Sequence, residues 1–193
     1  MKDDILIVGI GGTLRAGSST ERAVQGVLRH AQAAGAKTIM YSGPAVNFPM
    51  YAPENPERSP EALQYIEDIR NADAVIFGSP GYHGGISGLI KNAIDYTEDM
   101  SKDTNVYLAG KAVGCVATGF GWQGANSALH ALRLVVHALR GWVTPLGIAL
   151  NTKEKLFDEN GNCLRDDVDG QLKIMAAELI EFASARKKAQ QVG

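Results

Sequence analysis

Short apolar segments alternate with longer amphipathic segments along the whole 193-residue chain, and this alternation constrains the fold more than any other feature. Five apolar segments are interpreted as strands: 5–10, 38–41, 74–77, 112–117 and 143–149. The first, third and fourth are continuously apolar, which is typical of strands that helices cover on both faces of a parallel sheet. The last contains Pro145, which cannot donate a ladder hydrogen bond, so we expect this strand at an edge of the sheet.

The stretches between these segments repeat their apolar residues with the period of an α-helix. We expect helices that start near Ser19, after Ser59-Pro60 and near Ser87. A fourth helix would have Ala125, Leu129, Leu132, Val136 and Leu139 on one face, and a last helix would have Leu172, Met175, Leu179 and Ala183. Five β-α units without an internal repeat or a linker predict an α/β protein with one domain over residues 1–193. The favoured architecture is flavodoxin-like, with three layers and a doubly wound five-stranded parallel sheet of strand order 2-1-3-4-5.

This strand order also predicts where a ligand binds. In an open sheet of this kind the site lies beyond the carboxyl ends of strands 1 and 3, where the direction of winding reverses. The loops that follow Ile10, Phe77 and Ala117 are therefore the candidate site.

The first of these loops, residues 9–20, is rich in glycine and hydroxyl groups and leads directly into a helix. A helix N-terminus offers free backbone N–H groups and a partial positive charge to an anion. Arg15 adds a planar, permanently charged fork that suits phosphate. These features favour a phosphate site. The simpler alternative is a strand-to-helix turn capped by Ser18 or Ser19 that needs no ligand.

Two known phosphate-binding patterns almost match this loop but fail at one position each. The dinucleotide fingerprint lacks its third glycine, because Leu14 stands there, and no acidic residue follows the second strand to hold a ribose. The nucleoside-triphosphate loop would run from Gly12 to Gly17, but Ser18 replaces its lysine. A monophosphate is therefore the favoured guest.

The other two loops combine glycines with aromatic side chains. Residues 79–88 contain Tyr82 and His83 among glycines, which allow the backbone to approach a planar ligand, although the same residues would also serve as a cover for the sheet edge. Residues 118–124 contain Phe120 and Trp122, which would either stack on a ligand or pack within the protein. A phosphate site beside a site for a flat ring describes a mononucleotide such as FMN.

At these residues the chain resembles the NAD(P)H-dependent FMN reductase family, which includes quinone- and chromate-reducing flavoproteins. The matching segments are 12–18, 80–95 and 118–119. The resemblance implies FMN as cofactor, NADPH or NADH as co-substrate, and transfer of a hydride through the flavin to a flavin, quinone or similar small acceptor. It also implies a homodimer or homotetramer. The flavin supplies the chemistry, so we assign no side chain a catalytic role.

The resemblance further implies which residues bind the cofactor. Those implied for the phosphate are Thr13, Arg15, Ser18, Ser19 and Thr20. Those implied for the ribityl chain and the ring are Pro80, Gly81, Tyr82 and His83, with Gly84 in the same turn. Thr118 and Gly119 are implied near the polar edge of the ring.

Charge and composition narrow the remaining classes of function. The net charge of −2 lacks the basic excess of a nucleic-acid-binding protein and the strong acidity of a docking electron carrier. The two cysteines and four histidines show no metal-binding spacing. No apolar run is long enough to span a membrane and no signal peptide is visible, so we expect a cytoplasmic protein. A flavodoxin-like electron carrier and a non-catalytic flavin-binding module stay open as alternatives.

Two segments outside the three loops also carry expectations. Residues 47–53 form a long loop with apolar side chains, which we interpret as a flap over the flavin or a subunit contact. Residues 158–163 resemble the start of a calcium loop, but Cys163 occupies the position that requires glycine. Asn160-Gly161 is more simply a hairpin turn.

Overall fold

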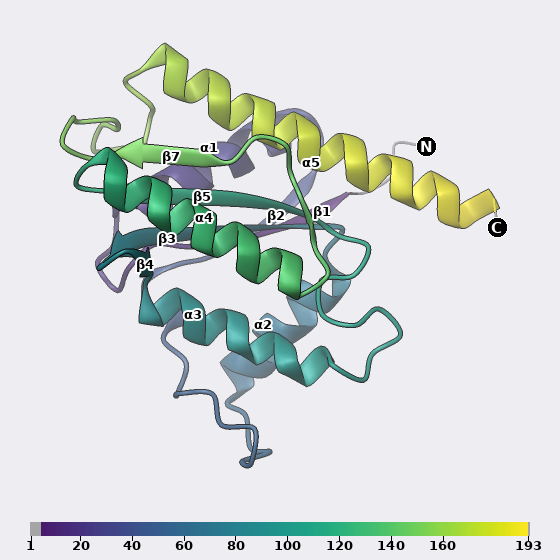
Figure 1. Cartoon of the computed structure of the whole chain (residues 1–193). Coiled ribbons are helices and arrows are strands. Elements are labelled where there is room, and N and C mark those ends of the chain that lie inside the picture. Colours follow the sequence, from purple (N-terminus) through teal and green to yellow (C-terminus); the bar gives the residue numbers. More distant parts are fainter. Residues whose placement is uncertain (1–4, 193) are drawn as a thin grey trace.

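A mostly parallel sheet lies between two layers of helices in the computed structural model, which describes residues 5–192 (Figure 1). The strands are β1 (Leu6–Gly11), β2 (Lys37–Tyr41), β3 (Ala74–Tyr82), β4 (Gly85–Ile86), β5 (Ala112–Gly119), β6 (Trp142–Val143) and β7 (Ile148–Asn151). The helices are α1 (Ser19–Ala33), α2 (Pro60–Asn71), α3 (Gly88–Asp95), α4 (Trp122–Ala138) and α5 (Asp166–Val192), with short 3₁₀ helices η1 (Gly43–Val46) and η2 (Tyr96–Met100).

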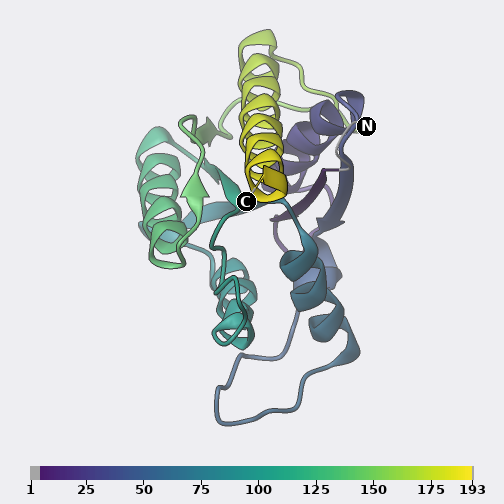
Figure 2. The same ribbon diagram turned by 90° about the vertical axis from the view of Figure 1, so that its right-hand side faces the viewer.

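The sheet follows the predicted strand order. Its neighbours run β2-β1-β3-β5-β6, and β7 also pairs with β5, so the predicted fourth and fifth strands are β5 and the β6–β7 pair. Helices α1 and α5 cover one face, and α2, α3 and α4 cover the other (Figures 1 and 2). The flavodoxin-like three-layer prediction is confirmed.

The fifth strand differs from its prediction because it is interrupted. Residues 143–149 do not form one strand: β6 pairs with the start of β5 and β7 with its end. Pro145 has no N–H, and the neighbouring Leu146 N–H donates to the Glu178 carboxylate, 3.1 Å away, rather than to the sheet. The proline does lie at the sheet edge, as expected, and it divides the strand there.

The predicted second loop is a β-hairpin in the structure. Strand β3 continues past Phe77 to Tyr82 and folds back as the antiparallel β4. His83 and Gly84 form the turn with φ values of +49° and +88°, the left-handed conformations of a type I′ turn. Pro80 fits in this strand because β1 has already ended at the level of Gly78, so no partner on that side needs its missing N–H.

Serine side chains fix the start of three helices. The hydroxyl oxygens of Ser18, Ser59 and Ser87 accept hydrogen bonds from the backbone N–H groups of Glu21, Ala62 and Ile90. Ser18, rather than Ser19, is therefore the N-cap of α1. Helices α4 and α5, which begin at Trp122 and Asp166, contain the apolar positions expected of the last two helices except Leu139, which caps α4.

The segment between η1 and α2 extends away from the sheet as a long loop (Figure 2). Its backbone is anchored at one end, because the Asn92 amide donates to the carbonyl oxygens of Phe48 and Pro49. At the other end Arg58 forms a two-pronged ion pair with Asp99, at 2.7 and 2.9 Å. These contacts tie the two ends of the loop to α3 and η2. None of the helices within residues 5–192 is long and apolar enough to cross a membrane.

Helix α1 approaches the sheet closely because glycines face it. A Cβ at Gly78 would overlap with Val24 Cγ2 and would lie 3.0 Å from Thr20 Cγ2. A Cβ at Gly11 would lie 2.8 Å from the same valine methyl group. The start of α1 is thereby held against the carboxyl ends of β1 and β3.

We predict that Gly78→Ala lowers the free energy of unfolding by about 1–3 kcal/mol, because the added methyl group overpacks the contact with the stiff Val24 side chain. Urea denaturation measures this loss. Gly88→Ala, at a position where a Cβ meets nothing within 4 Å, is the matched control and should leave the midpoint unchanged or slightly higher. Equal midpoints for Gly78→Ala and the parent chain would contradict the packing argument.

Candidate functional site

The register of the sheet brings the three candidate loops to one edge. Gly11 at the end of β1 lies opposite Gly78 of β3, and Pro80 of β3 lies opposite Thr118 of β5. The first loop, the hairpin and the third loop therefore leave the sheet side by side, each at the carboxyl end of its strand. The predicted meeting of these segments is what the structure shows.

A buried hydrogen bond joins the first loop to the third. Thr20 Oγ1 and Thr118 Oγ1 are 2.6 Å apart, and both side chains are buried. One hydroxyl donates to the other, which leaves the second hydrogen for another acceptor. A ligand oxygen at this edge would be such an acceptor.

The first loop presents donors around the N-terminus of α1. Ser18 is buried and its oxygen caps the helix, so its hydroxyl hydrogen is still available to a ligand. Thr13 Oγ1 accepts from the Arg15 N–H at 3.2 Å and shapes an exposed turn. The Arg15 guanidinium is exposed and makes no hydrogen bond or ion pair with residues 5–192. An unpaired guanidinium beside a helix N-terminus suits an anion.

Two charged residues in the first turn of α1 contact this loop and were not predicted from the sequence. Glu21 accepts a hydrogen bond from the Gly17 N–H at 2.9 Å, so its carboxylate holds the loop closed. Arg22 lies against the same loop, with Nη2 3.1 Å from the position of a Cβ on Gly17. A glutamate three residues after a serine N-cap is a capping-box signature and could have identified Glu21. The sequence offers no comparable signal for Arg22.

The hairpin places exposed groups beside this loop. Tyr82 is 53% exposed, and His83 and Gly84 at the turn are exposed too. Its base is fixed by Ser79, whose hydroxyl accepts from the Ser87 N–H at 2.9 Å. Gly81 is a packing residue, because a Cβ there would lie 2.5 Å from the Gly124 carbonyl oxygen of α4. The structure thus presents Tyr82 and the turn to solvent while Gly81 lies against α4.

The third loop adds aromatic surface and a contribution from the end of β7. Phe120 is 81% and Trp122 59% exposed. The Thr152 N–H and hydroxyl both donate to the Gly119 carbonyl oxygen, at 2.8 and 3.1 Å. Lys153 Nζ lies 5.6 Å from the centre of the Phe120 ring. The sequence alone did not place the residues after β7 at this edge. It predicted a fifth strand over residues 143–149, whereas β7 ends at Asn151.

The chemistry of this edge is that of a binding site. Within residues 5–192 no three histidine, cysteine or carboxylate side chains are grouped to hold a metal ion. Cys115 is fully buried in β5, and burial raises the pKa of its thiol to about 12, which makes a thiolate nucleophile unavailable. What remains is a set of hydroxyl, N–H and guanidinium donors next to exposed rings, which suits a phosphate joined to a planar group.

Comparison with known proteins identifies relatives across most of the chain. A family described as NADPH-dependent FMN reductase matches residues 5–155. The NAD(P)H-dependent FMN reductase PA1204 of Pseudomonas aeruginosa is 32% identical over 173 residues, covering 86% of this chain and 88% of its own. An FMN-dependent NADPH-azoreductase of Staphylococcus aureus is 29% identical over 130 residues, covering 64% of this chain and 65% of its own.

Two solved structures share the fold. The flavoenzyme NAD(P)H:(acceptor) oxidoreductase FerB from Paracoccus denitrificans superposes with a TM-score of 0.77 at 18% identity, covering 94% of this chain and 98% of that one. A flavodoxin, WrbA-like protein from Agrobacterium tumefaciens gives a TM-score of 0.60 at 17% identity, covering 96% and 99%. At these identities the likeness concerns the fold.

We predict that Thr20→Val lowers the free energy of unfolding by about 1–3 kcal/mol, because it leaves the buried Thr118 hydroxyl without its partner. The Thr20→Val/Thr118→Val double variant should lose no more than the single variant, since it removes both polar groups together. Urea denaturation of both single variants and the double variant measures the coupling. Strictly additive losses would show that the two hydroxyl groups do not interact.

Proposed function

The chain belongs to the NADPH-dependent FMN reductase family and is an FMN-dependent NAD(P)H oxidoreductase, and we propose that it binds FMN across the three segments at the carboxyl edge of its sheet. The observation that carries this proposal is the convergence of the phosphate-suited first loop with the hairpin and the third loop, tied together by the Thr20–Thr118 hydrogen bond. The residues 1–193 would form one such domain.

The phosphate of FMN would lie at the N-terminus of α1. The proposed ligands are Thr13, Arg15, Ser18, Ser19 and Thr20. Two features of the structure support this assignment: the unpaired Arg15 guanidinium and the hydroxyl hydrogen that Ser18 keeps after capping the helix. Arg22 would add a second positive charge beside the loop, next to Gly17.

The ribityl chain and the ring would lie along the hairpin. The proposed contacts are Pro80, Gly81, Tyr82, His83, Gly84, Thr118 and Gly119. The type I′ turn and the buried base at Ser79 give this segment a fixed shape, so its backbone is in place before the ring arrives. The Gly119 carbonyl already accepts from Thr152, so Gly119 would contribute by its close approach and Thr118 by its hydroxyl.

FMN held by these residues would supply the redox chemistry, which takes a hydride from NADPH or NADH and delivers electrons to a small acceptor, for which we propose a flavin, a quinone or a similar compound. The protein's part would be to hold the cofactor and to orient it for both substrates. No side chain of the described site is needed as an acid or base for the hydride step, so we assign none a catalytic role.

We further propose that the protein is cytoplasmic and forms a homodimer or homotetramer. The loop of residues 47–53 is the proposed subunit contact, because its backbone is anchored by Asn92 while Met50 is 81% exposed. A loop held this firmly suits a fixed contact surface better than a moving flap.

Reduction of the purified protein tests the function directly. Protein saturated with FMN should show a flavin absorbance band that NADPH or NADH bleaches without oxygen, and that a quinone restores. Protein without FMN should not oxidise either coenzyme. A preparation that takes up no FMN, or whose bound FMN neither coenzyme reduces, would contradict the assignment.

We predict that Arg15→Gln weakens the binding of FMN about tenfold to a hundredfold, because it removes charged hydrogen bonds to the phosphate. Riboflavin has no phosphate and should bind the variant and the parent chain equally. Fluorescence titration with both ligands separates the two effects. Arg140→Gln, an exposed arginine in the turn between α4 and β6 at the opposite edge, is the matched control. Equal losses for FMN and riboflavin would place Arg15 away from the phosphate.

A further inference from the structure

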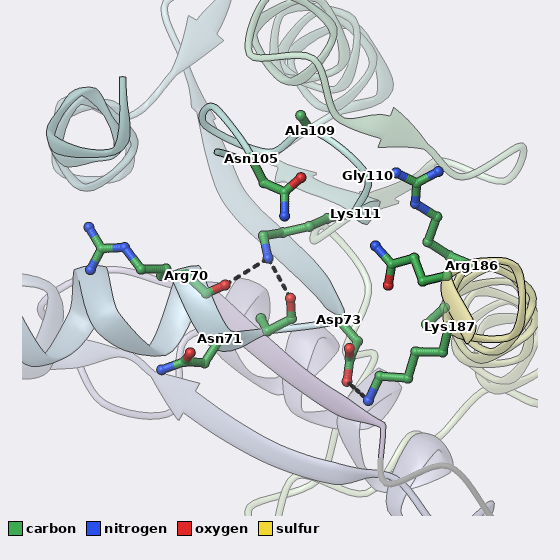
Figure 3. Close-up of a pocket in the computed structure, with 12 residues that line it drawn as sticks. Arg70, Asn71, Asp73, Asn105, Ala109, Gly110, Lys111, Arg186 and Lys187 are labelled. Carbon is green, nitrogen blue, oxygen red and sulfur yellow. Dashed lines mark hydrogen bonds and ion pairs between the residues drawn. The ribbon is translucent and has the colours of Figure 1, made fainter. Parts of the chain in front are cut away.

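A pocket lies at the opposite, amino edge of the sheet and has no part in the proposed flavin site (Figure 3). It has a volume of about 240 Å³ and lies between the end of α2, the turn before β5 and the last turns of α5. Thr118 lies seven residues along β5 from Lys111, so about 23 Å of strand separates this pocket from the flavin edge.

Lys111 is the central feature of this pocket. Its side chain is only 8% exposed, and its ammonium group donates to the carbonyl oxygens of Arg70 at 3.0 Å and Ala72 at 2.5 Å (Figure 3). These bonds cap the C-terminus of α2 and use two of its three hydrogens. No carboxylate of residues 5–192 lies within ion-pair distance of it. Buried charges are normally paired, whereas the two acceptors of this ammonium are uncharged carbonyl oxygens.

Arg186 faces the same pocket from α5. It extends toward Gly110 (Figure 3), where a Cβ would lie 3.4 Å from its Nε atom. The guanidinium makes no hydrogen bond or ion pair with residues 5–192. Gly110, with a φ of +80°, has no side chain to keep the guanidinium away from the backbone beside Lys111.

The other charged side chains that line the pocket are held in ion pairs. Asp73 forms an ion pair with Lys187 at 2.7 Å and also accepts from the Leu6 N–H. Arg70 is paired with Glu67 and Asp103. Lys111 and Arg186 are the cations lining the cavity that form no ion pair within residues 5–192. Burial lowers the pKa of the Lys111 ammonium more than Asp73 raises it.

We propose that this pocket binds a small oxyanion carrying a phosphoryl group, held between the buried Lys111 ammonium and the Arg186 guanidinium. A phosphate monoester carries a charge of about −1.5 to −2 at neutral pH, which matches the two unpaired cations. The guanidinium supplies the planar fork and the ammonium a point charge, the two modes by which proteins hold phosphate. A monocarboxylate would neutralise only one of them.

Thermal unfolding of FMN-saturated protein tests the proposal, because the flavin then occupies the other anion site. Inorganic phosphate, added at constant ionic strength with chloride as the balance, should raise the melting temperature saturably. Arg186→Gln should weaken this response about tenfold or more. Lys188→Gln, which removes a neighbouring exposed charge of α5 outside the pocket, is the matched control and should leave it unchanged.

Further arms assign the effect to one site and one chemistry. Lys111→Met should also abolish the response to phosphate. Because loss of the α2 cap lowers the melting temperature by itself, the quantity compared is the shift in melting temperature that phosphate causes in each variant. Arg15→Gln should retain the shift, which separates this pocket from the flavin site even where FMN does not bind. If glycerol 3-phosphate raises the melting temperature at lower concentration than inorganic phosphate does, the ligand is a phosphorylated metabolite. The reverse order would indicate free phosphate. A response unchanged by Arg186→Gln, lost in Arg15→Gln, or equalled by acetate would overturn the proposal.

Discussion

The close approach of α1 to β1 and β3 is the contact on which the rest of the site depends. Gly11 and Gly78 face Val24 and Thr20 of the helix, and neither position has room for a Cβ. This contact sets the start of α1 beside the carboxyl ends of two central strands. It also brings Thr20 within 2.6 Å of Thr118 at the end of β5. One steric constraint therefore positions both the helix N-terminus and the hydroxyl pair.

The arrangement of strands could be predicted from sequence because each central strand is a continuous apolar run, and such runs need helices on both faces. The details that failed are those set by tertiary contacts. Pro145 divides the fifth strand because Leu146 finds a partner in Glu178 on a helix far along the chain. The hairpin of β3 and β4 was hidden because Pro80 usually argues against a strand. It is tolerated here only because β1 has already ended.

The site was predictable for a different reason. Parallel strands place all their carboxyl ends together, so three loops could be grouped before any of their contacts was known. Glycines at this edge have two structural roles, positive φ and close packing, which the sequence alone does not distinguish. Gly84 supplies a positive φ at the tip of the hairpin, whereas Gly81 and Gly119 make room for the first turn of α4. Arg22 and Thr152 escaped notice because their place at the edge follows from helix packing and from the register of β7.

The two edges of the sheet differ in how they can hold an anion. Helices begin at the carboxyl edge, so backbone N–H groups and a partial positive charge are present there without any charged side chain. At the amino edge α2 ends, and its free carbonyl oxygens repel anions. A cation is needed there first, and Lys111 supplies it by capping Arg70 and Ala72. The cap satisfies the carbonyl oxygens of the helix end with two of the three ammonium hydrogens. Lys111 and Arg186 together bring more positive charge to this edge than the cap requires. The same helix polarity thus makes anion binding at one edge a property of the backbone, and at the other a property of side chains alone.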